Sequence, residues 1–379
     1  MNLIFTCGGT AGHISPALAV AKLAAERDPS VQILFVGADD GMETDLVPRA
    51  GYQLETVRIS NFQRKLTPSG IWHNIKAVCQ MILSRQKASR IIRNFKPDVI
   101  IGTGGYASYP VLRQGSKMGI PTAIHESNAV PGLTTKLVMN HVDKIMVSFA
   151  DSVQNYPDPA NVEVVGMPVN ELFFATGHED ARQSLSLDNR PLIVSFWGSL
   201  GAREMNRRIA DFMKLECENN YPWQHIHATG SYGWKWMPAL INDLGINTND
   251  SGIDIREFIY NMPEVMAAAD IIICRAGAAT IAETAAAGKP VIFIPSPNVT
   301  GNHQEKNARI IANNGGAIVC RENECTGESL YKVVSDLLSG HDEITSMGDA
   351  IHRMAVRDSA ERILEIIEDL ASRNTKGQN

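Results

Sequence analysis

The chain has 379 residues, a formal net charge of −6 and 44% hydrophobic residues. This length suggests two domains with full-sized cores, and the overall charge gives no case for nucleic acid as a partner. The six cysteines lack Cys-x-x-Cys spacing, so we expect reduced thiols in a cytoplasmic protein and no metal cluster. No apolar run is long enough to span a bilayer, and the N-terminus lacks the features of a signal peptide.

Short apolar, β-branched segments alternate with helical segments in the first half of the chain. The predicted strands are Leu3–Cys7, Val31–Val36, Val57–Ser60, Pro97–Ile101, Thr122–His125 and Lys144–Val147. The predicted helices include Ser15–Arg27, with Pro16 near its start, and Ile71–Phe95. This alternation indicates βαβ units and a parallel sheet.

The same pattern restarts near residue 192. The predicted strands are Leu192–Phe196, His225–Ala228, Ile253–Phe258, Ile271–Cys274, Val291–Ile294 and Ala317–Val319, and the predicted helices include Ala202–Lys214 and Ala278–Ala287. Each half opens with a strand, a glycine turn and a helix. The predicted fold class is therefore α/β, with two Rossmann-like domains whose parallel sheets face each other across a cleft lined by the glycine loops.

The predicted domains are residues 1–166 and 167–349, joined near Gly166–Asn170. Residues 350–379 form a third region. Within it, the amphipathic stretch Ala350–Ala371 places its apolar side chains mostly on one helical face and is expected to pack back on the first domain. The tail after Ser372 is polar.

The segment Asp270–Gly288 combines a buried-strand pattern, an Arg-Ala-Gly turn and a helix-forming run. N–H groups at the start of such a helix are unpaired, and the helix dipole favours an anion there, so the turn is a candidate phosphate or pyrophosphate site. Glu283, one to two turns into the helix, can accept hydrogen bonds from a ribose. The alternative is an ordinary strand–turn–helix with a solvated glutamate.

The glycine loop at residues 8–12 follows the first predicted strand and permits close approach of a ligand. His13, at the predicted helix start, can remove a proton from a sugar hydroxyl at neutral pH. A capping or packing role for His13 is the alternative. The polar clusters His125–Asn128 and Gly301–Asn307 suit a hydroxyl-rich ligand, although they also suit hydrogen-bonded loops.

Residues Gly102–Ala107 match the dinucleotide pattern G-x-G-x-x-G/A, and Glu126 lies at the end of the next predicted strand, where a ribose-binding acid is expected. This match supports a dinucleotide oxidoreductase. However, it follows a late strand of the domain, whereas the dinucleotide fingerprint belongs on the first strand. We therefore favour a coincidental match.

Residues 56–97 contain nine Lys and Arg residues and no Asp or Glu. Apolar side chains such as Trp72, Ile75 and Ile82 are interleaved with cations such as Lys76 and Arg85. This composition predicts a surface that binds anionic phospholipids. A helix whose apolar side is core is the alternative, and nucleic acid is a weaker one because no nucleic-acid-binding motif accompanies the patch.

Five segments in collinear order resemble the MurG family of glycosyltransferases. They are GGTAGHISPALAVA at 8–21, IGTGGYASYPV at 101–111, IHESNAVPGLTTK at 124–136, FWGSLGAREMN at 196–206 and CRAGAATIAETAAAGKP at 274–290. The resemblance implies a two-domain GT-B enzyme of peptidoglycan synthesis, peripheral on the cytoplasmic face of the bacterial cell membrane. Such an enzyme transfers GlcNAc from UDP-GlcNAc to the MurNAc 4-hydroxyl of undecaprenyl-pyrophosphoryl-MurNAc-pentapeptide (lipid I), with inversion, to give lipid II. Other cell-wall synthesis enzymes are further expected partners.

The resemblance also implies roles for individual residues. In the donor site, Ile259 reads the uracil edge, Gln304 holds GlcNAc hydroxyls and Glu283 contacts the ribose. The residues implied at the diphosphate are Ser199, Ala278, Ala279, Thr280, Ile281 and Ala282. The residues implied at the acceptor are Thr10, Ala11, Gly12, Gly104, Tyr106 and Asn128. His13 is the implied base, and Glu126 is the alternative base.

One position departs from the family pattern. The family often has an arginine where this chain has Asn170, which cannot supply that positive charge to the donor. Arg275 is a conjectured replacement. No Asp-x-Asp lies at a predicted strand end, so we expect no metal and no cofactor. The remaining alternatives are a UDP-GlcNAc 2-epimerase of the same architecture, the oxidoreductase, and a membrane-bound nucleotide-sugar sensor without turnover.

Overall fold

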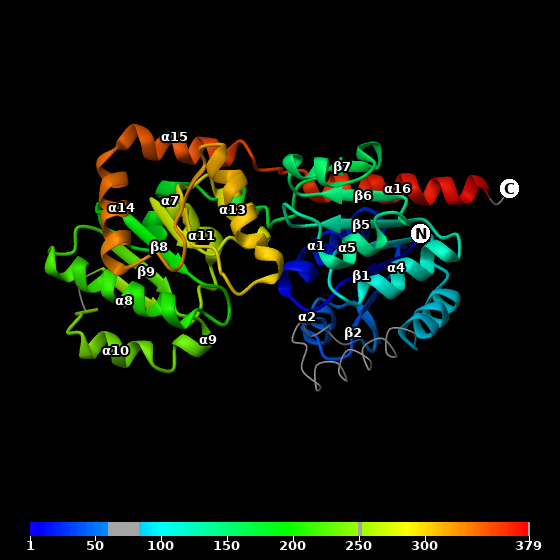
Figure 1. The fold of residues 1–379 in the computed structure, drawn as a ribbon, viewed down its shortest axis with the longest axis horizontal. Helices are drawn as coiled ribbons and strands as arrows, with labels where there is room; N and C mark the ends of the chain where they lie inside the picture. Colours follow the sequence, from blue (N-terminus) through cyan, green and yellow to red (C-terminus); the bar gives the residue numbers. More distant parts are fainter. Residues whose placement is uncertain (60–82, 249–251, 378–379) are drawn as a thin grey trace. The chain divides into compact units, whose positions relative to one another are not determined.

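The structure is a computed structural model that describes residues 1–59, 83–248 and 252–377. It divides into two compact units (Figure 1). The first unit consists of Met1–Pro168 and Asp358–Asn379, and the second of Val169–Arg357. The chain therefore leaves the first unit after Pro168 and returns to it after Arg357.

The first unit contains a seven-stranded parallel sheet in the order β3-β2-β1-β4-β5-β6-β7. Its strands are β1 Asn2–Thr6, β2 Gln32–Ala38, β3 Gln53–Val57, β4 Val99–Gly102, β5 Thr122–Glu126, β6 Lys144–Val147 and β7 Val162–Val164. Its helices are α1 Ala11–Arg27, α2 Glu43–Arg49, α4 Ser108–Lys117, α5 Leu133–Val138, η1 Ala150–Asn155, η2 Pro159–Asn161 and α16 Ser359–Gly377. Residues 83–95 are also helical.

The second unit contains a six-stranded parallel sheet in the order β10-β9-β8-β11-β12-β13. Its strands are β8 Leu192–Phe196, β9 Gln224–Ala228, β10 Ile253–Arg256, β11 Ile271–Cys274, β12 Val291–Phe293 and β13 Ala317–Val319. Its helices are α6 Leu172–Ala175, α7 His178–Ser184, α8 Arg203–Glu218, α9 Gly230–Gly233, α10 Met237–Asp243, α11 Met262–Ala268, α12 Ala278–Ala287, η3 Thr300–Asn302, α13 His303–Asn313, α14 Gly327–Ser339 and α15 His341–His352.

The two parallel α/β sheets are confirmed, and α12 spans the residues predicted for it. The third strand was predicted wrongly. β3 occupies Gln53–Val57, not Val57–Ser60, and Ser60 lies outside the described residues. The prediction also missed β7, Val162–Val164. Both are edge strands, which carry a weaker apolar signal than strands buried on both faces.

Helix α1 begins at Ala11, four residues before the predicted start. Thr10 is its N-cap residue, in an extended conformation, and Pro16 lies inside the helix. The prediction treated Pro16 as a first-turn residue, but the chain accommodates this proline in the second turn. As a result, the peptide N–H groups of Ala11 and Gly12 belong to the helix start.

The predicted amphipathic stretch Ala350–Ala371 is two helices in two units. α15 ends at His352 in the second unit, and α16 begins at Ser359 in the first. Ile363, Leu364 and Ile367 of α16 are buried in the core layer that α1 also joins.

Alternate residues of β1 serve opposite faces of the first sheet. Leu3 and Phe5 pack in the core layer that contains α1 and α16, whereas Ile4 packs with Val111 and Leu112 of α4 in the other layer. This division follows from the two-residue period of a strand. It accounts for the continuous apolar run in the β1 sequence, since both faces of a central parallel strand are covered.

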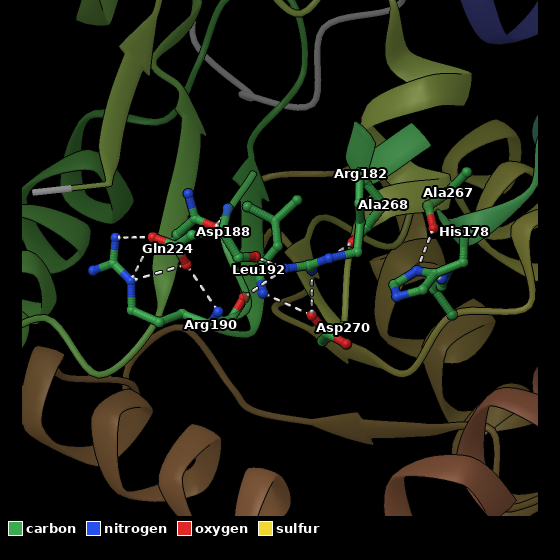
Figure 2. Close-up of polar contacts among 10 residues, drawn as sticks. His178, Arg182, Asp188, Arg190, Leu192, Gln224, Ala267, Ala268 and Asp270 are labelled. Atoms are coloured by element: carbon green, nitrogen blue, oxygen red, sulfur yellow. Dashed lines mark hydrogen bonds and ion pairs between the residues drawn. The ribbon is translucent and has the colours of Figure 1, made fainter. Parts of the chain in front are cut away.

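The amino ends of β8 and β11 are joined by a polar cluster (Figure 2). The Asp270 carboxylate accepts hydrogen bonds from Leu192 N–H at 2.7 Å and from the Arg182 guanidinium at 3.2 Å. Arg182 also donates to the carbonyl oxygen of Arg190 at 2.7 Å. Its side chain is 13% exposed, so the guanidinium is largely removed from water. This cluster fixes the strand ends opposite the glycine loops.

We predict that Arg182→Ala lowers the free energy of unfolding of the full chain by about 2–4 kcal/mol, because the half-buried Asp270 carboxylate loses its cation and the Arg190 carbonyl loses a charged donor. The matched control is Arg207→Ala, which removes an exposed pair with Glu204 and should change the same quantity by less than about 0.5 kcal/mol. Urea denaturation followed by circular dichroism measures both. Equal effects of the two substitutions would contradict the structural role of the cluster.

Candidate functional site

Each sheet has one point where the strand order reverses. In the first unit this point lies between β1 and β4, and in the second it lies between β8 and β11. Ligands of open parallel sheets bind beyond the carboxyl ends of the strands at such points. The predicted glycine segments Gly8–Gly12, Gly102–Gly105, Gly198–Gly201 and Gly277 lie at or directly after the ends of these four strands. The fold therefore places the predicted glycine loops at the edge where ligands are expected.

His13 lies in the first turn of α1, beside the loop that follows β1. Its Nδ1 is 3.0 Å from the carbonyl oxygen of Gly8 and 3.3 Å from the hydroxyl oxygen of Thr10. A carbonyl oxygen can only accept, so Nδ1 carries the proton in this bond. In the neutral imidazole, Nε2 is then an unprotonated acceptor, as a general base requires.

The loops after β1 and β4 pack directly against each other. A Cβ atom at Gly105, where φ is +84°, would lie 2.2 Å from the carbonyl oxygen of Gly8. A Cβ atom at Gly104, where φ is +108°, would lie 3.0 Å from Nε2 of His13. These contacts explain the glycines by close approach of two loops. They give a structural reason for the match to the dinucleotide pattern that does not involve a dinucleotide.

Glu43 is a residue of this region that the sequence analysis missed. It is the first residue of α2, its side chain is completely buried, and it accepts hydrogen bonds from Gly9 N–H at 3.1 Å and Ala38 N–H at 2.7 Å. Burial, and to a lesser extent the nearby Glu43 carboxylate, raises the pKa of the Cys7 thiol. No local pattern reveals Glu43, because its partners lie on other elements.

Glu126, at the end of β5, uses both carboxylate oxygens to bind the following loop and the start of α5. Oε1 accepts from the backbone N–H and the side-chain amide of Asn128, at 3.0 and 3.1 Å. Oε2 accepts from Gly132 N–H at 2.8 Å and from the Thr135 hydroxyl at 2.6 Å. The residue is only 6% exposed. Its hydrogen bonds fix the loop that presents Asn128.

The remaining acceptor-side candidate, Tyr106, is half-buried in the loop after β4. Thr10, Ala11 and Gly12 lie at the start of α1, which has no side-chain cap among the described residues. The structure thus gathers the predicted acceptor residues at the carboxyl edge of β1, β4 and β5.

In the second unit, α12 follows β11 after a three-residue turn. Gly277 is its N-cap residue, and no described side chain caps the helix. The N–H groups of Ala278, Ala279 and Thr280 occupy the first turn, whose backbone donors have no partner within a helix. Ile281 N–H already bonds to Gly277 O at 2.9 Å, so Ile281 and Ala282 lie beyond the free donors. The helix start therefore has the free N–H donors and the positive dipole end that suit a diphosphate.

The neighbouring loop after β8 presents Ser199, which is exposed between Gly198 and Gly201. Both glycines have positive φ, +83° and +77°. A Cβ atom at Gly201 would lie 2.0 Å from the carbonyl oxygen of Thr229, so the tight turn requires glycine there. β8 and β11 are adjacent, and Ser199 therefore follows the strand next to the one that leads into α12.

Glu283 lies in α12, on the second turn from its start. Desolvation raises the pKa of the Glu283 carboxyl to about 7. Such a group is close to half ionised at neutral pH. Ionising the buried Glu283 carboxyl costs free energy, and a hydroxyl group of a bound ligand can offset that cost by donating a hydrogen bond. Carboxyl groups with a raised pKa are often found at ligand sites for this reason.

Arg275 sits at the carboxyl end of β11, with its side chain 13% exposed. Its guanidinium pairs with Glu322 at 2.5 Å, donates to the carbonyl oxygen of Ile294 at 2.9 Å and lies 5.7 Å from the centre of the Trp197 ring. Asn170 accepts a hydrogen bond from Leu172 N–H at 3.0 Å through its side-chain oxygen. Asn170 therefore shapes the start of α6, and the charge of Arg275 is already paired.

Two further donor candidates follow other strands of the same sheet. Ile259 is 8% exposed in the loop after β10, beside Tyr260, which is 90% exposed. Gln304, in the first turn of α13, accepts a hydrogen bond from Ser296 N–H at 2.8 Å. Its amide nitrogen remains able to donate to a ligand.

The predicted membrane residues have different outcomes. Trp72, Ile75, Lys76 and Ile82 lie outside the described residues. Arg85 is half-buried; it donates to the Tyr109 hydroxyl at 2.6 Å and stacks on that ring at 5.4 Å. On the described part of this helix, Ala88, Ile91 and Ile92 are core residues, as the alternative interpretation held.

The second unit also contains a buried chain of polar side chains with the order of a catalytic triad. Ser195 Oγ lies 2.7 Å from Nε2 of His225, whose Nδ1 lies 2.9 Å from the Glu216 carboxylate. All three residues are completely buried. A substrate cannot reach Ser195, so these hydrogen-bonded side chains form a structural network that links α8 to β8 and β9. Burial lowers the pKa of the neighbouring His227 to about 3 and keeps it neutral.

Within the described residues, no helix is long and apolar enough to cross a membrane, and no group of three or more His, Cys, Asp or Glu side chains could hold a metal ion.

Comparisons with known proteins agree with this arrangement. Residues 3–147 match the glycosyltransferase family 28 N-terminal domain, and residues 192–363 match the C-terminal domain of the same family. A relative from Ruminiclostridium cellulolyticum, named UDP-N-acetylglucosamine--N-acetylmuramyl-(pentapeptide) pyrophosphoryl-undecaprenol N-acetylglucosamine transferase, is 40% identical over 98% of this chain and all of that protein.

Among solved structures, MurG of Acinetobacter baumannii is 26% identical, with a TM-score of 0.79 over 97% of this chain and 99% of the other. A structure titled as a putative UDP-N-acetylglucosamine 2-epimerase from Listeria monocytogenes is 13% identical, with a TM-score of 0.67 over 97% of this chain and 95% of the other. That second likeness concerns the fold alone. The chain therefore belongs to glycosyltransferase family 28 and, within it, to the MurG family.

Proposed function

We propose that this chain transfers GlcNAc from UDP-GlcNAc to the MurNAc 4-hydroxyl of lipid I, with inversion, to give lipid II. The observation that carries the proposal is a helix start at the switch point of each unit that no described side chain caps, in a chain similar over 98% of its length to a transferase of that name. Two such starts suit a reaction in which the donor and the acceptor each carry a diphosphate group.

The second unit is the proposed donor site. N–H groups of Ala278, Ala279 and Thr280, with Ser199, bind the diphosphate, and Glu283 accepts hydrogen bonds from the ribose. The backbone of Ile259 reads the uracil edge, while Gln304 binds GlcNAc hydroxyls. The leaving UDP gains negative charge as the glycosidic bond breaks, and preorganised helix N–H groups stabilise that charge. The proposal therefore requires no metal and no cofactor.

The first unit is the proposed acceptor site. Thr10 and the N–H groups of Ala11 and Gly12 bind the lipid pyrophosphate. Asn128, Gly104 and Tyr106 contact the acceptor sugar.

His13 is the proposed base for the 4-hydroxyl. Its hydrogen bond to Gly8 O leaves Nε2 unprotonated. Both oxygens of Glu126, the other candidate, already accept two hydrogen bonds each from the loop after β5 and from α5, so this carboxylate is poorly placed to take a further proton.

We further propose that the chain works peripherally on the cytoplasmic face of the bacterial membrane. The exposed side of the helix at residues 83–95 carries Lys87, Arg90 and Arg93. Exposed cations of this kind are attracted to anionic lipid headgroups. Other cell-wall synthesis enzymes remain expected partners.

The direct test of this function is incubation of the protein with labelled UDP-GlcNAc, with and without a lipid I analogue. We expect a labelled disaccharide-lipid only when the analogue is present. Formation of UDP-N-acetylmannosamine without the analogue would instead indicate the epimerase, and binding without any product would indicate a sensor. In the same assay, His13→Ala should lower kcat by about 10²–10⁴-fold, the usual contribution of general base catalysis. The control is His141→Ala, which removes an exposed imidazole. Full turnover by folded His13→Ala would refute the assignment of the base.

The pKa of Glu283 gives a prediction about donor affinity. Its carboxyl titrates at about 7 in the free protein, and its ionised form is the one that accepts ribose hydrogen bonds. UDP-GlcNAc affinity should therefore rise as pH increases from about 6 to 8, approaching a tenfold change per unit below the pKa. Calorimetric titrations at several pH values measure this dependence, and the donor diphosphate, being a diester, does not titrate in that range. Glu283→Gln should flatten the profile, and a flat wild-type profile would contradict the ribose role.

Membrane attachment makes a separate prediction. Replacing Lys87, Arg90 and Arg93 together by Gln should weaken sedimentation with phosphatidylglycerol-rich vesicles by about 100-fold, since about 1 kcal/mol per cation amounts to about 3 kcal/mol. A matched variant with the same change in net charge replaces three exposed cations of the second unit, Arg207, Lys214 and Lys332. If both variants bind these vesicles equally, the helix at 83–95 is not the attachment surface.

A further inference from the structure

The two hydrogen bonds that flank the first glycine loop meet on one peptide group. The carbonyl oxygen of Gly8 is 3.0 Å from Nδ1 of His13, and the N–H of Gly9 donates to the Glu43 carboxylate at 3.1 Å. The carbonyl of Gly8 and the N–H of Gly9 belong to the same peptide bond. A continuous chain therefore runs from the carboxylate, through one planar peptide, to the imidazole.

The direction of every bond in this chain is fixed by chemistry. Ala38 N–H and Gly9 N–H are donors, so both oxygens of Glu43 act as acceptors, as in an ionised carboxylate. Gly8 O can only accept, so Nδ1 of His13 carries the proton and Nε2 does not. Each bond polarises the next, because a peptide whose N–H is held by an anion carries more negative charge on its oxygen.

The surroundings of Glu43 are built to hold it in place. Its side chain is completely buried. A Cβ atom at Gly8, Gly37 or Gly41 would lie 2.6, 2.4 or 2.1 Å from an atom of the Glu43 side chain. Three glycines, one in the loop after β1, one near the end of β2 and one in the loop before α2, thus leave the space that the carboxylate occupies. The carboxylate accepts from two peptide N–H groups, and no cation is bonded to it among the described residues. Burying a carboxylate in this way costs free energy, so we look for a functional role that explains it.

We propose that Glu43 is a positioning residue that acts on His13 through the Gly8–Gly9 peptide: it locks the imidazole in the Nδ1–H tautomer and strengthens Nε2 as a base. The arrangement is a base and its carboxylate orienter with a peptide group inserted between them. This inference rests on the proposed function, in which His13 takes the proton of the acceptor hydroxyl.

The other groups near His13 do not replace Glu43 in this role. Thr10 Oγ, 3.3 Å from Nδ1, is neutral and can share the same proton. His125 is the titratable neighbour that interacts with His13, and burial lowers the pKa of His125, which keeps it neutral. The carboxylate is therefore the group that orients the peptide dipole toward the imidazole.

The test uses Glu43→Gln in the full chain, which keeps the shape of the side chain and removes its charge. The amide has one acceptor oxygen, so its NH₂ group must face one of the two peptide N–H donors. We expect kcat with the lipid I analogue to fall about 10–100-fold, by analogy with the loss of the partner that orients a metal-bound histidine, with the KM for UDP-GlcNAc changed less than about twofold.

The matched control is Asp98→Asn. Asp98 also accepts a backbone N–H, that of Asn2 at 2.7 Å, in the same unit but at the amino end of β4. The Asp98→Asn variant should lose a similar amount of unfolding free energy, measured by urea denaturation, and keep the wild-type kcat. A loss of kcat in Asp98→Asn equal to that in Glu43→Gln would reduce the effect to general destabilisation and overturn the proposal.

A spectroscopic measurement separates orientation from a structural effect. In protein labelled with ¹⁵N-histidine, the His13 signals are assigned by their absence from His13→Ala, and the two ring nitrogens report the tautomer. We expect the Nδ1–H form in the wild-type protein and a shift toward Nε2–H in Glu43→Gln. An Nε2–H tautomer in the wild type would overturn the proposal even if Glu43→Gln failed to fold. An unchanged tautomer in a folded Glu43→Gln would do the same.

The two variants His13→Ala and Glu43→Gln together distinguish an error in the role of Glu43 from an error in the proposed function. If His13→Ala keeps its turnover, His13 is not the base. If His13→Ala is inactive while Glu43→Gln keeps both wild-type kcat and tautomer, the function stands and Glu43 has no role in it.

Discussion

The structure depends on one recurring constraint: a parallel strand that runs straight into a helix leaves backbone N–H groups without partners. In this chain the constraint appears at the reversal point of both sheets, after β1 and after β11, and in neither place does a described side chain cap the helix. Beside these starts, glycines let neighbouring loops approach closely, Gly105 against Gly8 in the first unit and Gly201 against Thr229 in the second. The fold therefore presents two positive helix ends, and the substrates of the proposed reaction each supply a diphosphate to meet one.

The division of labour between the units follows from the side chains around each helix start. Around α1 lie an imidazole with a free Nε2 and loops rich in amide and hydroxyl groups, which suits proton removal from a sugar. Around α12 lie a glutamate whose pKa is raised to about 7 and an arginine already paired with Glu322. The first set can activate a nucleophile, and the second can hold a nucleotide while its diphosphate departs.

Sequence patterns predicted those parts of the fold whose signals are local. β11 and α12 were predicted at their true bounds because an apolar run, a glycine turn and a Gly-Lys-Pro stop adjoin one another. β3 and β7 are edge strands with few apolar residues, and their positions were set by pairing with β2 and β6. Sequence patterns could not identify Glu43, because its role depends on a hydrogen bond with Gly9, which lies 34 residues earlier in the chain. Arg85 looked like a free cation in sequence, whereas its packing on Tyr109 arises from the tertiary fold.

A crystal structure with UDP tests most directly whether the start of α12 binds the donor diphosphate. We expect diphosphate oxygens within hydrogen-bond distance of the N–H groups of Ala278, Ala279 and Thr280, with the ribose hydroxyls against Glu283. UDP bound with its diphosphate on the loop after β1, or away from both glycine loops, would contradict this expectation.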